Sequence, residues 1–263
     1  MDMHHERLGA GRPLLLIHGL GSTRRTWDPV LDGLAAHREV IALDLPGFGA
    51  TPPLEGEVTV ARLADAVSGF IDVHGLTGVD LLGSSVGARL VLELARRGVG
   101  GTAVALSPGG FWTPRQRRLF GASIGASVRL VRTLQPVLPA LTRNPVTRTA
   151  LLAQLSPRPW ALDEGLVLRE LRAWASSPGY DALLRALVHG PDQDGATRLR
   201  TPGDVVIGWG RQDRVVTPGQ AERALQRFPD AELHWFDSCG HFPMWDRPAE
   251  TVELVLSRTS GTG

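Results

Sequence analysis

Short runs of apolar residues alternate along the chain with stretches whose apolar positions recur every three or four residues. The runs predict buried strands, and the recurring positions predict amphipathic helices. Strands are predicted at residues 13–17, 40–44, 79–82, 103–106, 205–209 and 232–236. Between the second and third strands, one helical stripe is formed by Val60, Leu63, Ala64, Val67, Phe70 and Ile71. This alternation is typical of a mostly parallel α/β sheet that helices cover on both faces.

Residues 109–200 break the alternation, because their apolar positions follow helical spacing interrupted by prolines at 136, 139, 145, 157 and 159. This segment holds 13 arginines and 6 acidic residues (+7), whereas the rest of the chain holds 15 and 21 (−6). The chain therefore divides into an α/β core at 1–108 and 201–263 and a helical insertion at 109–200.

Residues 1–12 have room for about one strand at the sheet edge. Thr217, Pro218 and Gln220 predict a helix start with a capping box.

Composition narrows the class of protein. The chain has 263 residues, 43% hydrophobic and 21% charged, which is typical of a globular protein. Its net charge of +1 disfavours a nucleic-acid partner. The single cysteine, Cys239, excludes a disulfide framework and a multi-thiolate metal site, and no metal-ligand motif is present. The N-terminal region has only a short apolar run, so we expect a cytoplasmic protein without a membrane partner.

A candidate nucleophile follows the third predicted strand. Residues 83–87 read Gly-Ser-Ser-Val-Gly and precede a helical run, which makes a G-x-S-x-G motif between strand and helix. Such a strained turn presents its central hydroxyl only if the residues two before and two after it are small. Gly83 and Gly87 satisfy this condition for Ser85, whereas the larger flanking residues of Ser84 do not. Ser85 is therefore the predicted nucleophile, and an ordinary Gly/Ser turn is the alternative.

A serine needs an imidazole to take its proton, and the imidazole needs a carboxylate to fix its tautomer. On this kind of sheet the acid and then the histidine follow later strands. Asp213 follows the predicted strand 205–209, and His241 follows the strand 232–236. Asp237, on the same loop as His241, is the rival acid. The other histidines have no such placement.

The oxyanion that forms when a serine attacks a carbonyl needs N–H donors already in position. The predicted donors are the backbone N–H groups of Val86, after the nucleophile, and of Leu20, in the loop after the first strand. That loop allows a rival interpretation as a dinucleotide-binding fold, since Gly19 and Gly21 follow a strand and Asp44 ends the next. Arg24 stands where the third glycine would be needed, and the rival leaves the serine, acid and histidine unexplained.

These motifs resemble the α/β-hydrolase fold family: HG after a strand, DLPGFG at 44–49, the turn at 83–87, GWGRQD and CGHFP. The resemblance covers nearly the whole chain and implies the α/β-hydrolase fold, with the insertion after the strand 103–106 acting as a helical cap. It also implies a hydrolase without a cofactor or metal. Relatives that cleave halides or epoxides carry an aspartate where Ser85 stands. Many relatives carry histidine or asparagine where Ser84 stands, so the subfamily stays open.

The insertion contains three tryptophans, Trp112, Trp160 and Trp174, which are candidates to line a pocket for an apolar acyl or aromatic group. They could equally form the core of the cap. The leading hypothesis is a serine hydrolase that acts on a small-molecule carboxylic ester, thioester or lactone. Carbon–carbon bond hydrolases and cofactor-free perhydrolases on the same fold are alternatives. A ligand receptor without turnover is a third alternative, but its usual mark would be a broken triad, and here all three candidate residues are present.

Overall fold

Seven strands form one sheet in the computed structural model, which describes residues 2–259. The strand order is β1-β3-β2-β4-β5-β6-β7. The strands are β1 (His5–Leu8), β2 (Pro13–Ile17), β3 (Glu39–Leu43), β4 (Asp80–Ser84), β5 (Ala103–Leu106), β6 (Val205–Gly210) and β7 (Glu232–Phe236). β1 is antiparallel to β3, and all other neighbours are parallel. Together with the helices on both faces, this is the α/β-hydrolase fold that the motifs imply.

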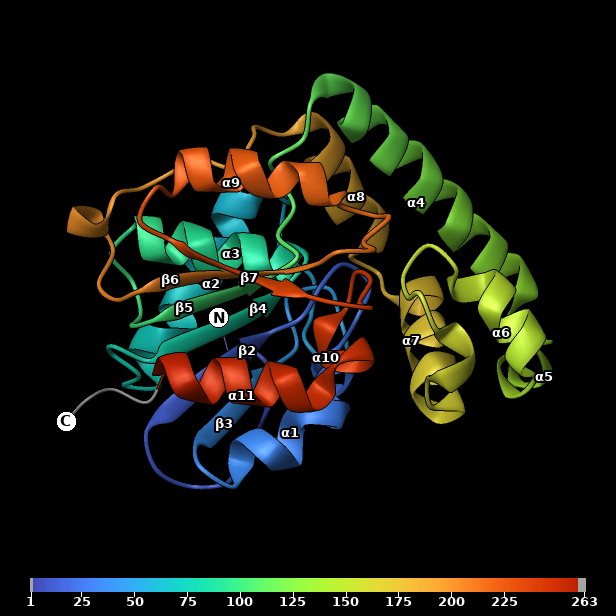
Figure 1. Ribbon diagram of the computed structural model, residues 1–263, viewed down its shortest axis with the longest axis horizontal. Coiled ribbons are helices and arrows are strands. Elements are labelled where there is room, and N and C mark those ends of the chain that lie inside the picture. Colours follow the sequence, from blue (N-terminus) through green and yellow to red (C-terminus); the bar gives the residue numbers. More distant parts are fainter. Residues whose placement is uncertain (1, 260–263) are drawn as a thin grey trace.

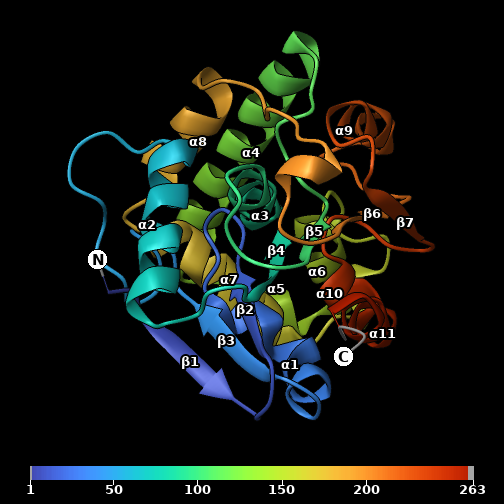
Figure 2. The same cartoon turned by 90° about the vertical axis from the view of Figure 1, so that its left-hand side faces the viewer.

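The predicted strands match the sheet closely. Three of them agree to the residue, and β4 and β6 run further at their carboxyl ends, to Ser84 and Gly210. One strand precedes β2 in the described residues, as the short N-terminal segment predicts, and it lies at the edge of the sheet (Figure 2). The predicted capping box is wrong: the Thr217 side chain caps nothing, and its hydroxyl instead accepts a hydrogen bond from Gln116 Nε2 at 3.2 Å.

Both faces of the sheet are buried, because consecutive strand residues point to opposite sides. Leu15 and Ile17 pack in one apolar cluster, and Leu14 and Leu16 pack in the other. The first cluster includes residues of α2 (Val60–Val73), α3 (Val86–Arg96) and α9 (Ala221–Arg227), and the second those of α1 (Asp28–Ala35), α10 (Pro243–Asp246) and α11 (Pro248–Thr259). Figure 1 shows the two helical layers above and below the sheet.

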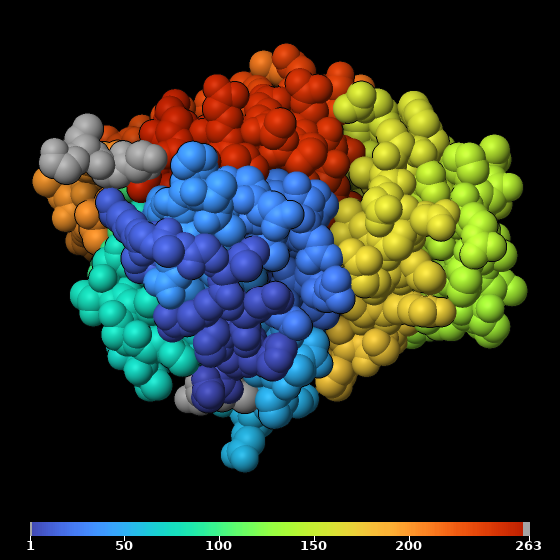
Figure 3. Space-filling model, turned by 90° about the horizontal axis from the view of Figure 1, so that it is seen from below, coloured from blue at the N-terminus to red at the C-terminus, as the bar shows by residue number. Residues whose placement is uncertain are grey.

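Residues 109–200 lie between β5 and β6 and contain five helices: α4 (Pro114–Leu134), α5 (Leu138–Arg143), α6 (Pro145–Leu152), α7 (Glu164–Ser176) and α8 (Tyr180–His189). No strand interrupts them in this fully described segment. Helices α4 to α7 extend to one end of the molecule in Figure 1, and the underside view shows the segment beside the N-terminal strands and α11 (Figure 3). Within residues 2–259, no helix combines the length and hydropathy needed to cross a membrane.

A buried ion pair joins the ends of the core. Arg38 Nη2 contacts Asp80 Oδ2 at 2.7 Å, and both side chains are almost inaccessible to solvent. The same guanidinium donates to the carbonyls of Arg12 and Pro13, before and at the start of β2, and to that of Thr259, at the end of α11. One side chain therefore links β2, β4 and the C-terminal helix.

Loss of this arginine leaves the Asp80 carboxylate buried with the half-exposed Arg12 and the N–H of Thr102 as its remaining partners. We expect Arg38→Ala to lower the free energy of unfolding by about 3–5 kcal/mol, measured by urea denaturation. Arg7→Ala is the matched control, since Arg7 pairs with Glu39 at the surface and its loss should cost less than about 1 kcal/mol. Equal losses in the two variants would contradict a structural role for the buried pair.

Candidate active site

Ser85 lies on a strained turn between β4 and α3. Its backbone has φ 57° and ψ −113°, in a region that residues other than glycine rarely adopt. A Cβ atom added to Gly83 would lie 2.2 Å from the carbonyl oxygen of Gly87, and one added to Gly87 would lie 2.0 Å from that of Ile17. Strand and helix therefore approach so closely that neither glycine can be replaced without a shift. Ser84 is fully buried and does not line the cavity described below.

The structure brings Ser85, His241 and Asp213 together from three loops at the carboxyl ends of β4, β7 and β6. His241 Nε2 lies 3.0 Å from Ser85 Oγ, and His241 Nδ1 lies 2.9 Å from Asp213 Oδ2. Both His241 and Asp213 are buried, at 2% exposure. With Nδ1–H donated to the carboxylate, the lone pair of Nε2 faces the serine hydroxyl, as a general base requires.

The second oxygen of the Asp213 carboxylate is also held. Oδ1 accepts hydrogen bonds from the N–H groups of Val215 at 2.8 Å and Val216 at 3.0 Å. The rival acid, Asp237, is exposed and pairs with Arg211 at 2.7 Å. Asp213 is therefore the acid that contacts the imidazole in this structure.

The loop after β2 is shaped by a buried histidine. His18 Nε2 accepts a hydrogen bond from the N–H of Leu45 at 2.9 Å, so the ring proton is on Nδ1, which donates to the carbonyl of Gly19 at 2.7 Å. Burial lowers the pKa of His18 and outweighs the opposing effects of Gly19 and Asp44. A neutral imidazole thus fixes the direction of the Gly19 carbonyl.

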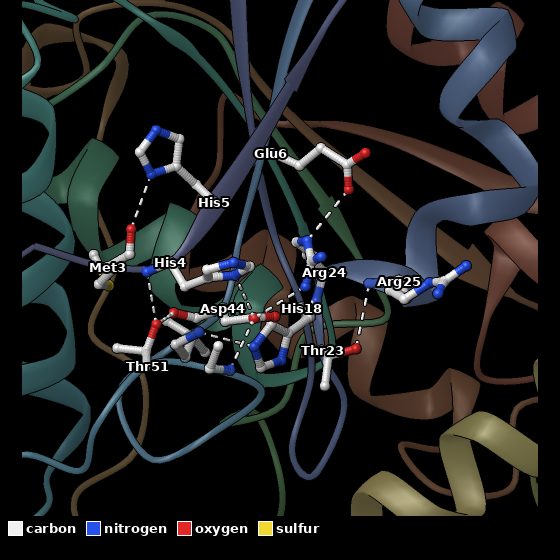
Figure 4. Close-up of polar contacts among 12 residues, drawn as sticks. Met3, His4, His5, Glu6, His18, Thr23, Arg24, Arg25, Asp44 and Thr51 are labelled. Carbon is white, nitrogen blue, oxygen red and sulfur yellow. Dashed lines mark hydrogen bonds and ion pairs between the residues drawn. The ribbon is translucent and has the colours of Figure 1, made fainter.

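Asp44, at the end of β3, lies in a polar network beside this loop (Figure 4). Its carboxylate accepts hydrogen bonds from the N–H groups of Arg24 at 2.7 Å and Ala50 at 3.1 Å, and it pairs with His4 and with the Arg24 guanidinium. The side chain is fully buried. Asp44 therefore binds two loops of the protein, whereas a ribose-binding acid in a dinucleotide fold would face a ligand.

The two predicted oxyanion donors are the residue that follows Ser85 and a residue of the loop after β2. Val86 is the first residue of α3, so its N–H has no acceptor within the helix. Within residues 2–259, the N–H of Leu20 has no hydrogen-bond partner. A Cβ added to Gly19 would meet Ser85 Cβ at 3.2 Å, which shows how closely the loop approaches the serine.

A cavity of about 300 Å³ lies between the core and the insertion and reaches Ser85 and His241. Helix α4 supplies more of its wall than any other element, and its apolar residues there include Phe120, Ile124, Val128 and Val131; Leu151 of α6 joins them. Ser127 and Gln154 are polar, but none of the lining residues is an acid or an arginine. The cavity therefore fits an uncharged, largely apolar group.

Only one of the three candidate tryptophans lines this cavity, namely Trp174. Trp112 is buried against Phe120, with the ring centroids 5.0 Å apart, and lines a smaller pocket on another side. Trp160 is 52% exposed. Trp112 and Trp160 therefore do not line this cavity, because a position in the insertion does not determine which way a side chain faces.

Sequence reasoning missed the contacts by which the insertion holds the histidine loop. The N–H of His241 donates to the carbonyl of Leu155 at 2.7 Å. Asp246 accepts from the Ser156 hydroxyl at 2.5 Å and from the N–H of Gly240 at 2.8 Å. The insertion supplies none of Ser85, Asp213 and His241, yet its backbone helps to position the loop of His241. No sequence motif marks such a contact.

One group of side chains has metal-ligand geometry. Candidate ligand atoms of Asp2, His5 and His74 lie within 4.8 Å of one another. Asp2 is exposed, and none of the three residues lines the cavity. Cys239 is buried, and burial raises the pKa of its thiol, so it is a poor ligand and a poor nucleophile.

Comparison with known proteins identifies the family. The model of the alpha/beta hydrolase family matches residues 14–254, and the chain belongs to this family. It is 30% identical to a 2-hydroxy-6-oxo-2,4-heptadienoate hydrolase of Pseudomonas putida, over 94% of this chain and 89% of the relative. It is 31% identical to a 2-hydroxymuconate semialdehyde hydrolase of Pseudomonas putida, over 94% and 86% of the two chains.

Solved structures agree with the fold. An esterase from Thermogutta terrifontis superposes with a TM-score of 0.75 at 19% identity, over 97% of this chain and 92% of the esterase. A meta-cleavage product hydrolase from Pseudomonas fluorescens superposes with a TM-score of 0.72 at 20% identity, over 98% and 94%. At this identity the superpositions support the architecture alone.

The close approach at the Ser85 turn predicts that Gly87→Ala disrupts the fold around it. The added methyl group would collide with backbone, so we expect a large fall in Tm or loss of soluble protein, measured by thermal denaturation. Gly69→Ala is the control, because Gly69 lies within α2 and an added Cβ meets nothing within 4 Å. That variant should keep or raise Tm. A Gly87→Ala protein as stable as the wild type would contradict the steric argument.

Proposed function

We propose that the protein is a serine hydrolase that cleaves an uncharged carboxylic ester, thioester or lactone. The observation that carries the proposal is the array in which Asp213, His241 and Ser85 are hydrogen-bonded in series at the end of an apolar cavity. A carboxylate, an imidazole and a hydroxyl in this order are the groups that acyl transfer through serine requires. We further propose that the insertion, residues 109–200, acts as a cap over this site.

In the proposed reaction, Ser85 Oγ attacks the substrate carbonyl while its proton passes to His241 Nε2. The imidazolium that forms is stabilised by the buried Asp213 carboxylate. The N–H groups of Leu20 and Val86 donate to the oxyanion of the tetrahedral intermediate. His241 then gives its proton to the leaving oxygen or sulfur, and an acyl-enzyme forms on Ser85. Water activated by His241 hydrolyses this ester and restores the enzyme.

The cavity supports an apolar acyl group as the part of the substrate that is recognised. Aliphatic and aromatic side chains of α4 and α6 would cover such a group and remove its surface from water. An acyl chain needs no ion pair there, which agrees with the absence of acids and arginines among the lining residues. Specificity would then rest on the length and shape of the chain.

Carbon–carbon bond hydrolysis is the second candidate, because two relatives that cover most of the chain carry names of that kind. The substrate for which one relative is named, a heptadienoate, has a carboxylate. Burying a carboxylate without a cation is costly, and no arginine lines this cavity. This difference favours an uncharged substrate over a dienoate. Parallel assays with p-nitrophenyl esters and with 2-hydroxy-6-oxo-2,4-heptadienoate distinguish the candidates.

The proposed triad predicts strongly non-additive effects. Ser85→Ala and His241→Ala should each lower kcat for p-nitrophenyl butyrate by several orders of magnitude. The double variant should be scarcely worse, because the two side chains act as one unit. Circular dichroism verifies that each variant is folded. If the losses multiplied in the double variant, the serine and histidine would be acting independently.

The identity of the acid is tested by a matched pair of substitutions. Asp213→Asn should also lower kcat strongly, since the imidazole loses the partner that fixes its tautomer. Asp237→Asn is the control and should leave kcat near the wild-type value, because Asp237 is exposed and faces Arg211. The reverse order of effects would assign the acid to Asp237.

The apolar cavity predicts that its volume limits acyl length. Leu151→Trp adds bulk to a cavity-lining position of α6. We expect kcat/KM for p-nitrophenyl octanoate to fall about tenfold or more, with a much smaller change for the acetate. Val146→Trp is the control on the same helix, because Val146 is 76% exposed. An equal effect on both esters in Leu151→Trp would exclude an acyl-binding role for this wall.

A further inference from the structure

A buried carboxyl group of the insertion contacts the loop after β2, which lies beside Ser85. Glu170, on α7, is 2% exposed. Its Oε2 accepts a hydrogen bond from the Ser22 hydroxyl at 2.7 Å, across 148 positions of sequence. Ser22 belongs to the loop that holds Gly19 and Leu20 beside Ser85. Glu170 is therefore the polar link between α7 and this loop.

Apolar contacts from the same region hold the loop on its other side. A Cβ added to Gly21 would lie 2.8 Å from Trp174 Cδ1 and 2.6 Å from Tyr180 Cε2, so both rings press on the backbone there. Trp174 lies one helical turn after Glu170, and both rings also line the cavity. The Ser177 hydroxyl contacts the Gly21 carbonyl at 3.4 Å. The position of the loop thus depends on α7 and the turn that follows it.

The charge state of Glu170 follows from its surroundings. Burial raises the pKa of Glu170 to about 8, and the opposing effects of the Ser22 hydroxyl, of Arg169 and of the Trp174 indole are smaller. Arg169 is itself paired with Asp28 of α1 at 2.8 Å, and Asp28 raises the pKa of Glu170 further. At neutral pH the carboxyl is therefore mostly uncharged.

We propose that Glu170 is a positioning residue that, as an uncharged carboxylic acid, clamps the loop of residues 19–22 against α7. Ionisation would leave a charge buried beside Arg169, which is already paired with Asp28, and local separation of α7 from the loop would relieve that cost. The inference rests on the proposed function in one respect, namely that the clamped loop presents the Leu20 N–H to an oxyanion. The clamp itself is a property of the fold.

The sign of the pH effect follows from the two ionisation states. The pKa of Glu170 in the folded protein, about 8, lies above the value of about 4.3 for an unperturbed glutamate. The clamp is therefore complete at acid pH and is lost as the pH rises through about 8. With a pKa of about 8, only about one molecule in ten keeps the proton at pH 9, so we expect the clamp to weaken between pH 7 and pH 9.

Two measurements on the full-length protein test the proposal. Hydrogen–deuterium exchange of peptides that cover residues 19–23 reports the clamp, and comparison of variants at equal pH cancels the intrinsic exchange rates. The rate of Ser85 labelling by a fluorophosphonate reports the oxyanion hole. Glu170→Gln keeps an acceptor for Ser22 but cannot ionise, and Ser22→Ala removes the donor. Glu164→Gln is the control, because Glu164 lies at an exposed position of the same helix.

Between pH 7 and pH 9, we expect the wild type and Glu164→Gln to lose more protection from exchange than Glu170→Gln does. Their rate of labelling should also fall relative to that of Glu170→Gln, by up to about tenfold. Ser22→Ala should be poorly protected at both pH values, and it serves alone if Glu170→Gln does not fold. The same pH response in Glu170→Gln and the wild type, or full protection in Ser22→Ala, overturns the proposal.

Exchange and labelling also separate this inference from the proposed function. If exchange follows the pattern above but labelling does not, Glu170 supports the fold without positioning the loop for reaction, and the proposal fails. If the wild type is never labelled, the proposed function fails, and the exchange results alone decide whether the clamp exists.

Discussion

The close approach of α3 to β2 and β4 is the constraint on which the rest of the site depends. The surroundings of Gly83 and Gly87 leave no room for a Cβ. Because glycine has none, the chain can turn sharply enough there to hold Ser85 at a positive φ. The hydroxyl then stands clear of the sheet, at the edge where the loops after β6 and β7 bring Asp213 and His241. The strain of one residue is thus maintained by the packing of a helix and two strands, which together over-determine its conformation.

The helical insertion contributes to the geometry of the core as well as covering it. Its Leu155 carbonyl accepts a hydrogen bond from the N–H of His241, and its Ser156 donates to Asp246, which holds the same loop. Its Glu170 accepts a hydrogen bond from Ser22. The loop that carries His241 and the loop that carries Leu20 both have a contact from it. If the proposed function holds, a variant in the insertion would therefore change the rate of reaction without touching substrate.

The sequence was sufficient for the sheet, the family and the candidate triad, because each leaves a local signal. Apolar runs mark buried strands, two glycines mark the sharp turn, and an acid and a histidine follow successive strands. The remaining features depend on tertiary orientation. Trp112, Trp160 and Trp174 are pocket candidates because all three lie in the insertion, yet of the three Trp174 alone lines the cavity. Nothing near Ser22 in sequence indicates that it meets Glu170. Thr217 likewise had a capping pattern, but a side chain from α4 contacts its hydroxyl.

The insertion leaves the sheet after β5 and returns at β6, and these strands are hydrogen-bonded neighbours. Its two ends are therefore held close by the sheet itself, and the entropy of closing the segment grows only slowly with its length. Such a segment can be exchanged, lengthened or shortened in evolution with little effect on the sheet. The contacts at Leu155 and Glu170 limit that freedom, since a chimera with a foreign segment would need a carbonyl and a buried acid at equivalent points. The sheet can therefore accept insertions with new specificities, provided that the inserted segment also makes contacts that hold the loops in place.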